Sequence, residues 1–371
     1  MIRTHTPSSR CLPFLTIVLV LLVAGWATAQ DAASQVKAEA DRLQQSLKDK
    51  PINNPDFPNI GGMVGDALKG TQDALSAGQL YVSLERLAQA TNLLHGVRCA
   101  DEKAETVKSG LPAFEAEWGQ ASLQLTALDE KARQRTWTRS PAAVRALSEA
   151  AQAKAIPLME GSRGFATATG PKDGLFYMGQ AQGEAEFASF LATLKLPRPS
   201  AAFPLRSYLP ELQRLQEKTN AAFQPPKSID MHPRFIALNS TIKLANELDA
   251  RKAYAGALYV YLEATRHYGM LDAAALDAAK QVRVKNAIAV EQKKLAASRR
   301  DDSIAQIFIE RAQSQIAHTD GSAPSADELR SAQVIVEQVL PAYYAALKPA
   351  GPLHRASGKT VDVTLVRWPY T

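Results

Sequence analysis

The chain contains very little cysteine. It has two cysteines in 371 residues, and one of them, Cys11, lies in a segment that we expect to be removed. Cys99 is then the only thiol, so no intramolecular disulfide can form and the fold must depend on its apolar core. Because a free cysteine packs as a small hydrophobic side chain, we expect Cys99 to be buried.

Familiar catalytic, nucleotide and metal motifs are also lacking. The sequence has no paired C-x-x-C, no glycine-rich phosphate loop and no G-x-S-x-G nucleophile turn. Its histidines are scattered and do not show the spacing of metal ligands. We therefore predict no catalytic residue, no metal site and no cofactor.

Closely spaced acidic residues do not change this prediction. Glu184 and Glu186 stand two apart, and on a helix such side chains point in different directions, so they cannot form a carboxylate dyad. Glu263 and His267 are one helical turn apart. Two residues make an incomplete metal shell, so we expect them to form a surface ion pair.

The charge balance is only mildly basic. The formal net charge is +6, and removal of Arg3 and Arg10 with residues 1–29 would lower it to +4. The basic residues between positions 280 and 300 would spread around a helix instead of forming one stripe. The sequence therefore does not predict binding to nucleic acid.

The N-terminus has the pattern of a secretory signal peptide. A short basic segment, residues 1–10, precedes an apolar run, residues 12–26, and Ala27-Thr28-Ala29 supplies small residues for cleavage. We expect cleavage near Ala29 and export to the periplasm or the extracellular space. The alternative is a retained anchor helix, but the apolar run is shorter than the roughly 20 residues that a stable span needs. After cleavage we expect no stable membrane insertion.

Helical periodicity dominates the remaining chain, because apolar residues recur at three- and four-residue spacing. We predict an all-α fold with a short β-like tail at residues 351–371, where Val361, Val363 and Leu365 alternate with polar residues. The glycine-rich stretch 161–174 predicts a loop. Helices are expected at residues 31–49, 60–97 with a joint near Ala77-Gly78, 111–135, 141–155, 174–194, 209–223, 235–248, 253–268, 271–299, 303–317 and 326–347.

An internal repeat underlies the predicted architecture. Residues 77–85 (AGQLYVSLE) match residues 255–263 (AGALYVYLE) at seven of nine positions, 178 residues apart. We interpret this match as a duplication, which predicts two related helical bundles in tandem, with a helical hairpin in each that bends at the same relative place, near Ala77 and near Ala255. The bundles would span residues 30–197 and 203–350, with a linker at 198–202. The alternative is convergence on good helix formers.

One hairpin within the second copy resembles a tetratricopeptide unit. The small and large residues that carry this resemblance lie within residues 241–268 and are Leu244, Ala245, Tyr254, Ala257, Tyr261 and Ala264. The resemblance implies two helices packed closely through small side chains. The first copy departs from the pattern, with Gln79, Ser83 and Arg86 at the corresponding positions, and no 34-residue period continues on either side.

Both copies carry a tyrosine and a glutamate one helical turn apart. Tyr81 and Glu85 form one pair, and Tyr259 and Glu263 form the other. Their shared face indicates either ordinary packing, with the glutamate accepting the tyrosine hydroxyl, or a surface that binds a protein partner.

On this basis we predict an exported helical binding or scaffold protein without catalytic activity, of undetermined oligomeric state. The alternative is an exported enzyme whose site is assembled between the two helical halves. A cleft that gathers titratable groups would favour the enzyme.

Overall fold

The structure is a computed structural model. It describes the backbone of residues 12–133, 137, 140–197, 201–225, 229–272, 278–317 and 322–348. Within these ranges it describes the side chains from residue 31 onward, except those of residues 131–133, 272 and 278–279. The predicted tail at 351–371 and most of the linker lie outside the described residues, as does the basic segment of the predicted signal peptide. Within the described part, no helix combines the length and apolarity needed to span a bilayer.

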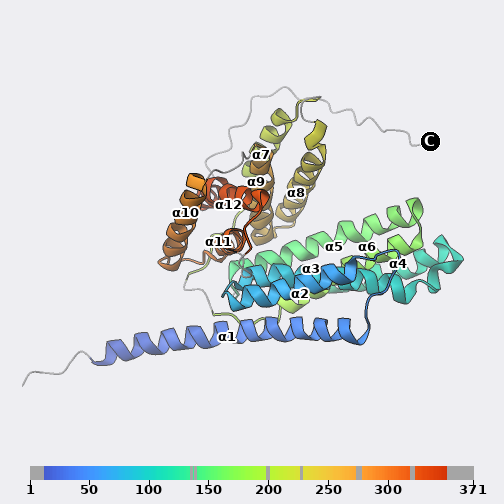
Figure 1. Ribbon diagram of the computed structural model, residues 1–371, viewed down its shortest axis with the longest axis horizontal. Helices are drawn as coiled ribbons and strands as arrows, with labels where there is room; N and C mark the ends of the chain where they lie inside the picture. The colour runs from blue at the N-terminus through green and yellow to red at the C-terminus, as the bar shows by residue number, and fades with distance from the viewer. Residues whose placement is uncertain are drawn as a thin grey trace, which may run out of the picture.

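The all-α prediction is confirmed: every regular element in the described part of the chain is helical (Figure 1). The first half contains α1 (Leu12–Asp49), α2 (Ile60–Ser76), α3 (Leu80–Lys103), a short turn of 3-10 helix (Thr106–Ser109), α4 (Leu111–Arg133), α5 (Ala142–Ala168) and α6 (Pro171–Leu191). The second half contains α7 (Leu209–Ala222), a 3-10 turn (Ile229–Met231), α8 (His232–Ala250), α9 (Tyr254–Asp272), α10 (Ala278–Ala296), α11 (Ser303–Ile316), α12 (Ala326–Val334), a π-helical turn (Ile335–Val339) and α13 (Leu340–Ala346).

Figure 1 shows the two halves meeting side by side. Helices α2 to α6 run roughly parallel or antiparallel to one another, with α1 along their outer side. In this layer α6 packs against both α3 and α5. Helices α8 and α9 pack against α5, whereas α11 packs against the beginnings of α3 and α5. The elements α5 and α11 therefore form most of the junction between the halves.

One large apolar core extends through both halves. Leu84 and Leu147 from the first half and Leu258 and Phe308 from the second belong to the same buried cluster. Burial of each such side chain contributes about 1.5–3 kcal/mol to folding. A smaller cluster around Phe114 fills the far end of the first half. The core is thus continuous across the junction.

The prediction of a loop at residues 161–174 is wrong. Helix α5 continues to Ala168, passing through Pro157, and α6 begins at Pro171. Only Thr169 and Gly170 break the helix, and Gly170 has a positive φ of 131°. Met159, Ser162 and Ala166 lie on one face of this segment and are buried. Tertiary burial of that face holds glycine-rich sequence in a helix that its composition alone does not favour.

The hairpins α2–α3 and α8–α9 bend at different points of the sequence match. The first joint lies near Ala77-Gly78, as predicted, with Gly78 at φ 72°. The second joint was expected near Ala255 but precedes Tyr254, and the left-handed residue there is Lys252 at φ 60°. Lys252 follows Gly78 by 174 residues, whereas the nonapeptides are 178 apart. The matched residues are therefore displaced by one helical turn relative to the two bends.

Candidate functional site

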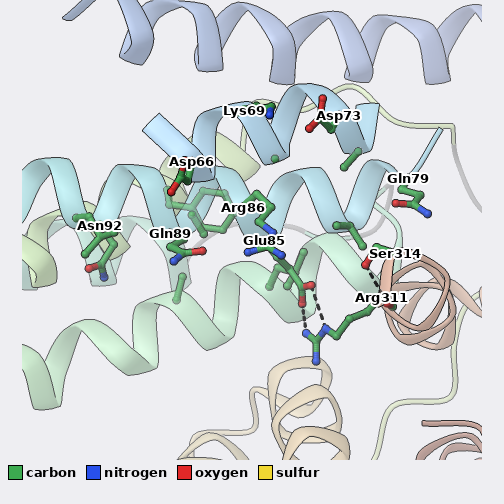
Figure 2. A pocket seen from close by; sticks show the side chains of 18 of the residues that line it. Asp66, Lys69, Asp73, Gln79, Glu85, Arg86, Gln89, Asn92, Arg311 and Ser314 are labelled. Carbon is green, nitrogen blue, oxygen red and sulfur yellow. Dashed lines mark hydrogen bonds and ion pairs between the residues drawn. The ribbon is translucent and has the colours of Figure 1, made fainter. Parts of the chain in front are cut away.

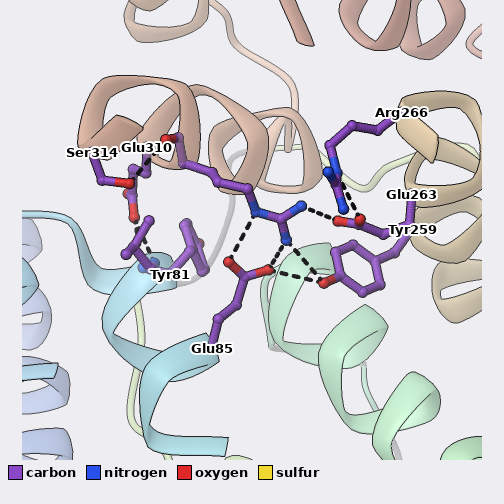
Figure 3. Close-up of polar contacts among 9 residues, drawn as sticks. Tyr81, Glu85, Tyr259, Glu263, Arg266, Glu310 and Ser314 are labelled. Carbon is purple, nitrogen blue, oxygen red and sulfur yellow. Dashed lines mark hydrogen bonds and ion pairs between the residues drawn. The ribbon is translucent and has the colours of Figure 1, made fainter. Parts of the chain in front are cut away.

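A buried cluster of charges joins the halves and is centred on Arg311 of α11. Figure 3 shows the side chains of Glu85, Tyr259 and Glu263 pointing toward one another in this cluster. The side chain of Arg311 is only 16% exposed. Its Nε and Nη2 donate to the carboxylate of Glu85 on α3, and its Nη1 donates to Glu263 on α9. Arg266 adds a second ion pair to Glu263, at 3.1 Å. Arg311 therefore binds one glutamate from each half.

The tyrosine hydroxyl of the second pair also enters this cluster. Tyr259 donates to Oε1 of Glu85 at 2.9 Å and accepts from Nη2 of Arg311 at 3.4 Å. Burial raises the pKa of Tyr259 well above its usual value, and the neighbouring carboxylates raise it further. Three of the four residues predicted from sequence, Glu85, Tyr259 and Glu263, are thus brought together. Glu85 and Tyr259 contact each other directly, and Glu263 joins them through Arg311, which no part of the prediction identified.

Tyr81, the fourth predicted residue, is held differently. Its side chain is buried, and its backbone N–H donates to Oε2 of Glu310 at 2.7 Å, next to a similar bond from Val82. On the other side of the junction, Glu149 of α5 accepts from the backbone N–H of Gly256 at 2.7 Å. Each carboxylate satisfies free N–H groups at the start of a helix in the opposite half. The two halves therefore cap each other's helices.

Burial and pairing shift the acidic groups of the junction in opposite directions. Burial raises the pKa of Glu263, but Arg311 and Arg266 more than compensate and lower it to about 2. Burial raises the pKa of Glu310 to about 7, against the opposing effect of its backbone donors. The predicted surface ion pair of Glu263 with His267 is wrong, because Glu263 instead binds Arg266 and Arg311. Burial lowers the pKa of His267.

An open groove of about 950 Å³ extends from this cluster along the first half (Figure 2). Helix α3 forms one wall with α2 as its rim, α5 forms the other wall, and α6 lies on the floor. Residues of α11 close one end, where Glu85, Tyr259 and Arg311 are among the lining side chains. The charged cluster is therefore the end wall of the groove.

The rim of the groove carries charges of both signs. Asp66, Lys69 and Asp73 lie on α2, Arg86 on α3 and Lys154 on α5. Figure 2 shows the α2 residues above the α3 wall. Among the described residues, none of these five side chains has a hydrogen-bonding or ion-pair partner. Their charged groups are accordingly free to contact a bound molecule.

The remaining reactive groups offer little chemistry. No group of three or more His, Cys, Asp or Glu side chains in the described part of the chain is placed to hold a metal ion. Cys99 is buried, as predicted, and burial raises the pKa of its thiol to about 11.

Comparison with protein-family models, with curated proteins and with solved structures finds no match to this chain. The functional argument therefore depends on the geometry of the groove and its end wall.

Proposed function

We propose that this protein is an exported, non-catalytic binding protein whose groove holds a segment of a partner polypeptide. The observation that carries the proposal is the row of unpaired charges of both signs along an open groove. Its volume of about 950 Å³ reaches the upper end of the range for small-molecule sites, and its open side lets a longer chain pass through. A polypeptide segment presents the alternating charges that such a rim can pair.

Site-specific photo-crosslinking in the producing cell tests this proposal. A photoreactive residue at Gln89, exposed on α3 and lining the groove, should yield an adduct of defined mass that contains partner peptide. The matched control is Gln120, an exposed glutamine on α4 that does not line the groove. Arg86→Glu should reduce the Gln89 adduct several-fold. Equal labelling from both positions, or no effect of Arg86→Glu, would contradict the proposal.

The export component has its own test. N-terminal sequencing of the protein recovered from the producing cell should return a sequence beginning at or near Gln30. Recovery of Met1 from a membrane fraction would reject the cleaved signal peptide and support the retained anchor helix.

An enzyme with a site between the halves is the second candidate. It is favoured by the gathering of shifted titratable groups at the junction, Glu310 above all. However, Oε2 of Glu310 accepts from the backbone of Tyr81 and Val82, and Oε1 accepts from Gln306 at 3.3 Å. Glu310 also does not line the groove. The geometry of the junction therefore supports a structural brace better than a proton-transfer site.

A further inference from the structure

The floor of the groove combines apolar walls with one carboxylate. Glu184 and Phe187 stand three residues apart on α6, so they share the face that lines the groove. Leu147 and Ala151 line it from α5, and Leu93 lines it from α3. A ligand group that reaches this floor therefore meets aliphatic and aromatic carbon together with a carboxylate.

Glu184 has little internal compensation for its charge. Its Oε1 accepts from Nδ2 of Asn92 at 3.0 Å, and within the described residues no other hydrogen bond or ion pair reaches the carboxylate. Burial raises its pKa, while Lys154 on the α5 wall lowers it without forming an ion pair. A half-buried carboxylate with a single amide partner favours an added cation, because charges removed from water need a partner.

The neighbouring carboxylate on the same helix provides a direct contrast. Glu186 stands two residues further on and points away from the groove, where His95 lies 2.9 Å and Arg42 3.1 Å from its oxygens. Glu186 thus contacts a histidine and an arginine, whereas Glu184, two residues earlier on the same helix and facing the groove, contacts neither a basic side chain nor a second amide within the described residues.

We propose that the floor of the groove is a subsite for a lysine or arginine side chain of the bound polypeptide, with Glu184 and Asn92 holding its charged end. The aliphatic stem of such a side chain would lie against Leu147, Ala151 and Phe187, as long cationic side chains do on apolar surface. A metal ion fits this site poorly, since one carboxylate and one amide do not fill a coordination shell. The inference rests on the proposed function, since it requires that the groove bind a polypeptide.

A positional-scanning peptide library tests this subsite on the full mature chain. One position is fixed as lysine, arginine, norleucine or glutamate, and the flanking positions are mixtures. Norleucine keeps the aliphatic stem and removes the charge. We expect lysine and arginine pools to bind about tenfold more tightly than the norleucine pool, as one well-placed charge-assisted hydrogen bond provides. Glu184→Gln should abolish this preference, whereas Glu186→Gln, which removes the same charge outside the groove, should preserve it.

The outcomes separate the subsite from the groove itself. Binding that depends on Arg86 but shows no preference for lysine or arginine would overturn the subsite and leave the proposed function standing. A cation preference that persists in Glu184→Gln would also overturn the subsite. Absence of binding by every pool, or binding that Arg86→Glu does not change, would overturn both. Circular dichroism melting of each variant shows that it is folded, so that lost binding is not lost structure.

Discussion

The hydroxyl of Tyr259 donates a 2.9 Å hydrogen bond to Oε1 of Glu85, which lies 174 residues earlier in the chain. This bond joins α9 to α3, the two helices that carry the matching nonapeptides. The tyrosine of one copy therefore contacts the glutamate of the other, and Arg311 binds the glutamates of both. The repeated residues hold the halves together instead of facing separate cores.

Removal of the Arg311 side chain should lower the free energy of unfolding of the protein. Arg311→Met would leave Glu85 and Glu263 buried without their cation, and breaking a buried pair costs about 3–5 kcal/mol. Urea unfolding at pH 7 measures the loss. Arg283→Met is the matched control, because Arg283 is exposed on α10, and it should change stability by less than about 0.5 kcal/mol. Equal stability of the two variants would show that the Arg311 cluster does not brace the junction.

Glu310 should make stability depend on pH in a specific direction. Its folded pKa, about 7, exceeds the ordinary 4.5, so the folded state retains a proton that the unfolded state releases. The stability that this bound proton contributes is fully present below pH 4.5 and is lost as the pH rises through about 7. Glu310→Gln keeps an oxygen for the N–H groups of Tyr81 and Val82 but cannot ionise. Its stability relative to the wild type should rise by up to about 3 kcal/mol between pH 4.5 and pH 8. A pH-independent difference in unfolding free energy would contradict this prediction.

Two glycine-to-alanine substitutions should change the stability of the protein in opposite directions. A Cβ at Gly179 would meet the backbone of His95 and lie 2.6 Å from Cβ of Cys99, so Gly179→Ala should separate α3 from α6 and cost about 1–3 kcal/mol. A Cβ at Gly164 in α5 meets nothing within 4 Å. Gly164→Ala should therefore stabilise the helix by about 0.5–1 kcal/mol. Thermal unfolding of both variants gives the signs, and destabilisation by Gly164→Ala would favour the loop that the sequence predicted.

Cys99 should be an unreactive thiol in the folded protein. Burial raises its pKa to about 11 from 9, which leaves about 100-fold less thiolate near neutral pH. Alkylation of the chain beginning at Gln30 should be slower by at least that factor than the same reaction in urea. Without reductant the protein should run as a monomer. A dimer that dissociates when a thiol reductant is added, and that Cys99→Ser does not form, would show that the Cys99 thiol is exposed.

The sequence was informative wherever local periodicity decides the outcome. Spacing of apolar residues was sufficient to predict the all-α fold, because a helical face is set by residues three and four apart. The Ala77-Gly78 pair marked the hairpin bend, since glycine accepts the positive φ found there. The burial of Cys99 followed from its apolar character and the lack of a disulfide partner. Glycine content misled at residues 161–174, since packing of Met159, Ser162 and Ala166 outweighs the helix-breaking tendency of Gly161 and Gly164.

The candidate site could be predicted only in part. The repeat drew attention to Glu85, Tyr259 and Glu263, because matching residues at helical spacing are visible in one dimension. Arg311 carries no such signal, since neither its neighbours nor any spacing marks it in the sequence. The different environments of Glu184 and Glu186 are equally invisible, because only the positions of α1, α3 and α5 around α6 determine which carboxylate contacts His95 and Arg42.

The amino-acid sequence by itself determined the helical character of the chain, the bend near Gly78 and the apolar faces that had to be buried. Only the tertiary structure decided which helices those faces meet. It set the bends 174 residues apart, so that Tyr259 lies against Glu85 and not in the place of Tyr81. The physical reason is range: helix formation depends on neighbours within one or two turns, whereas the Arg311 cluster and the groove depend on contacts between α3, α5, α9 and α11 that lie far apart in the chain.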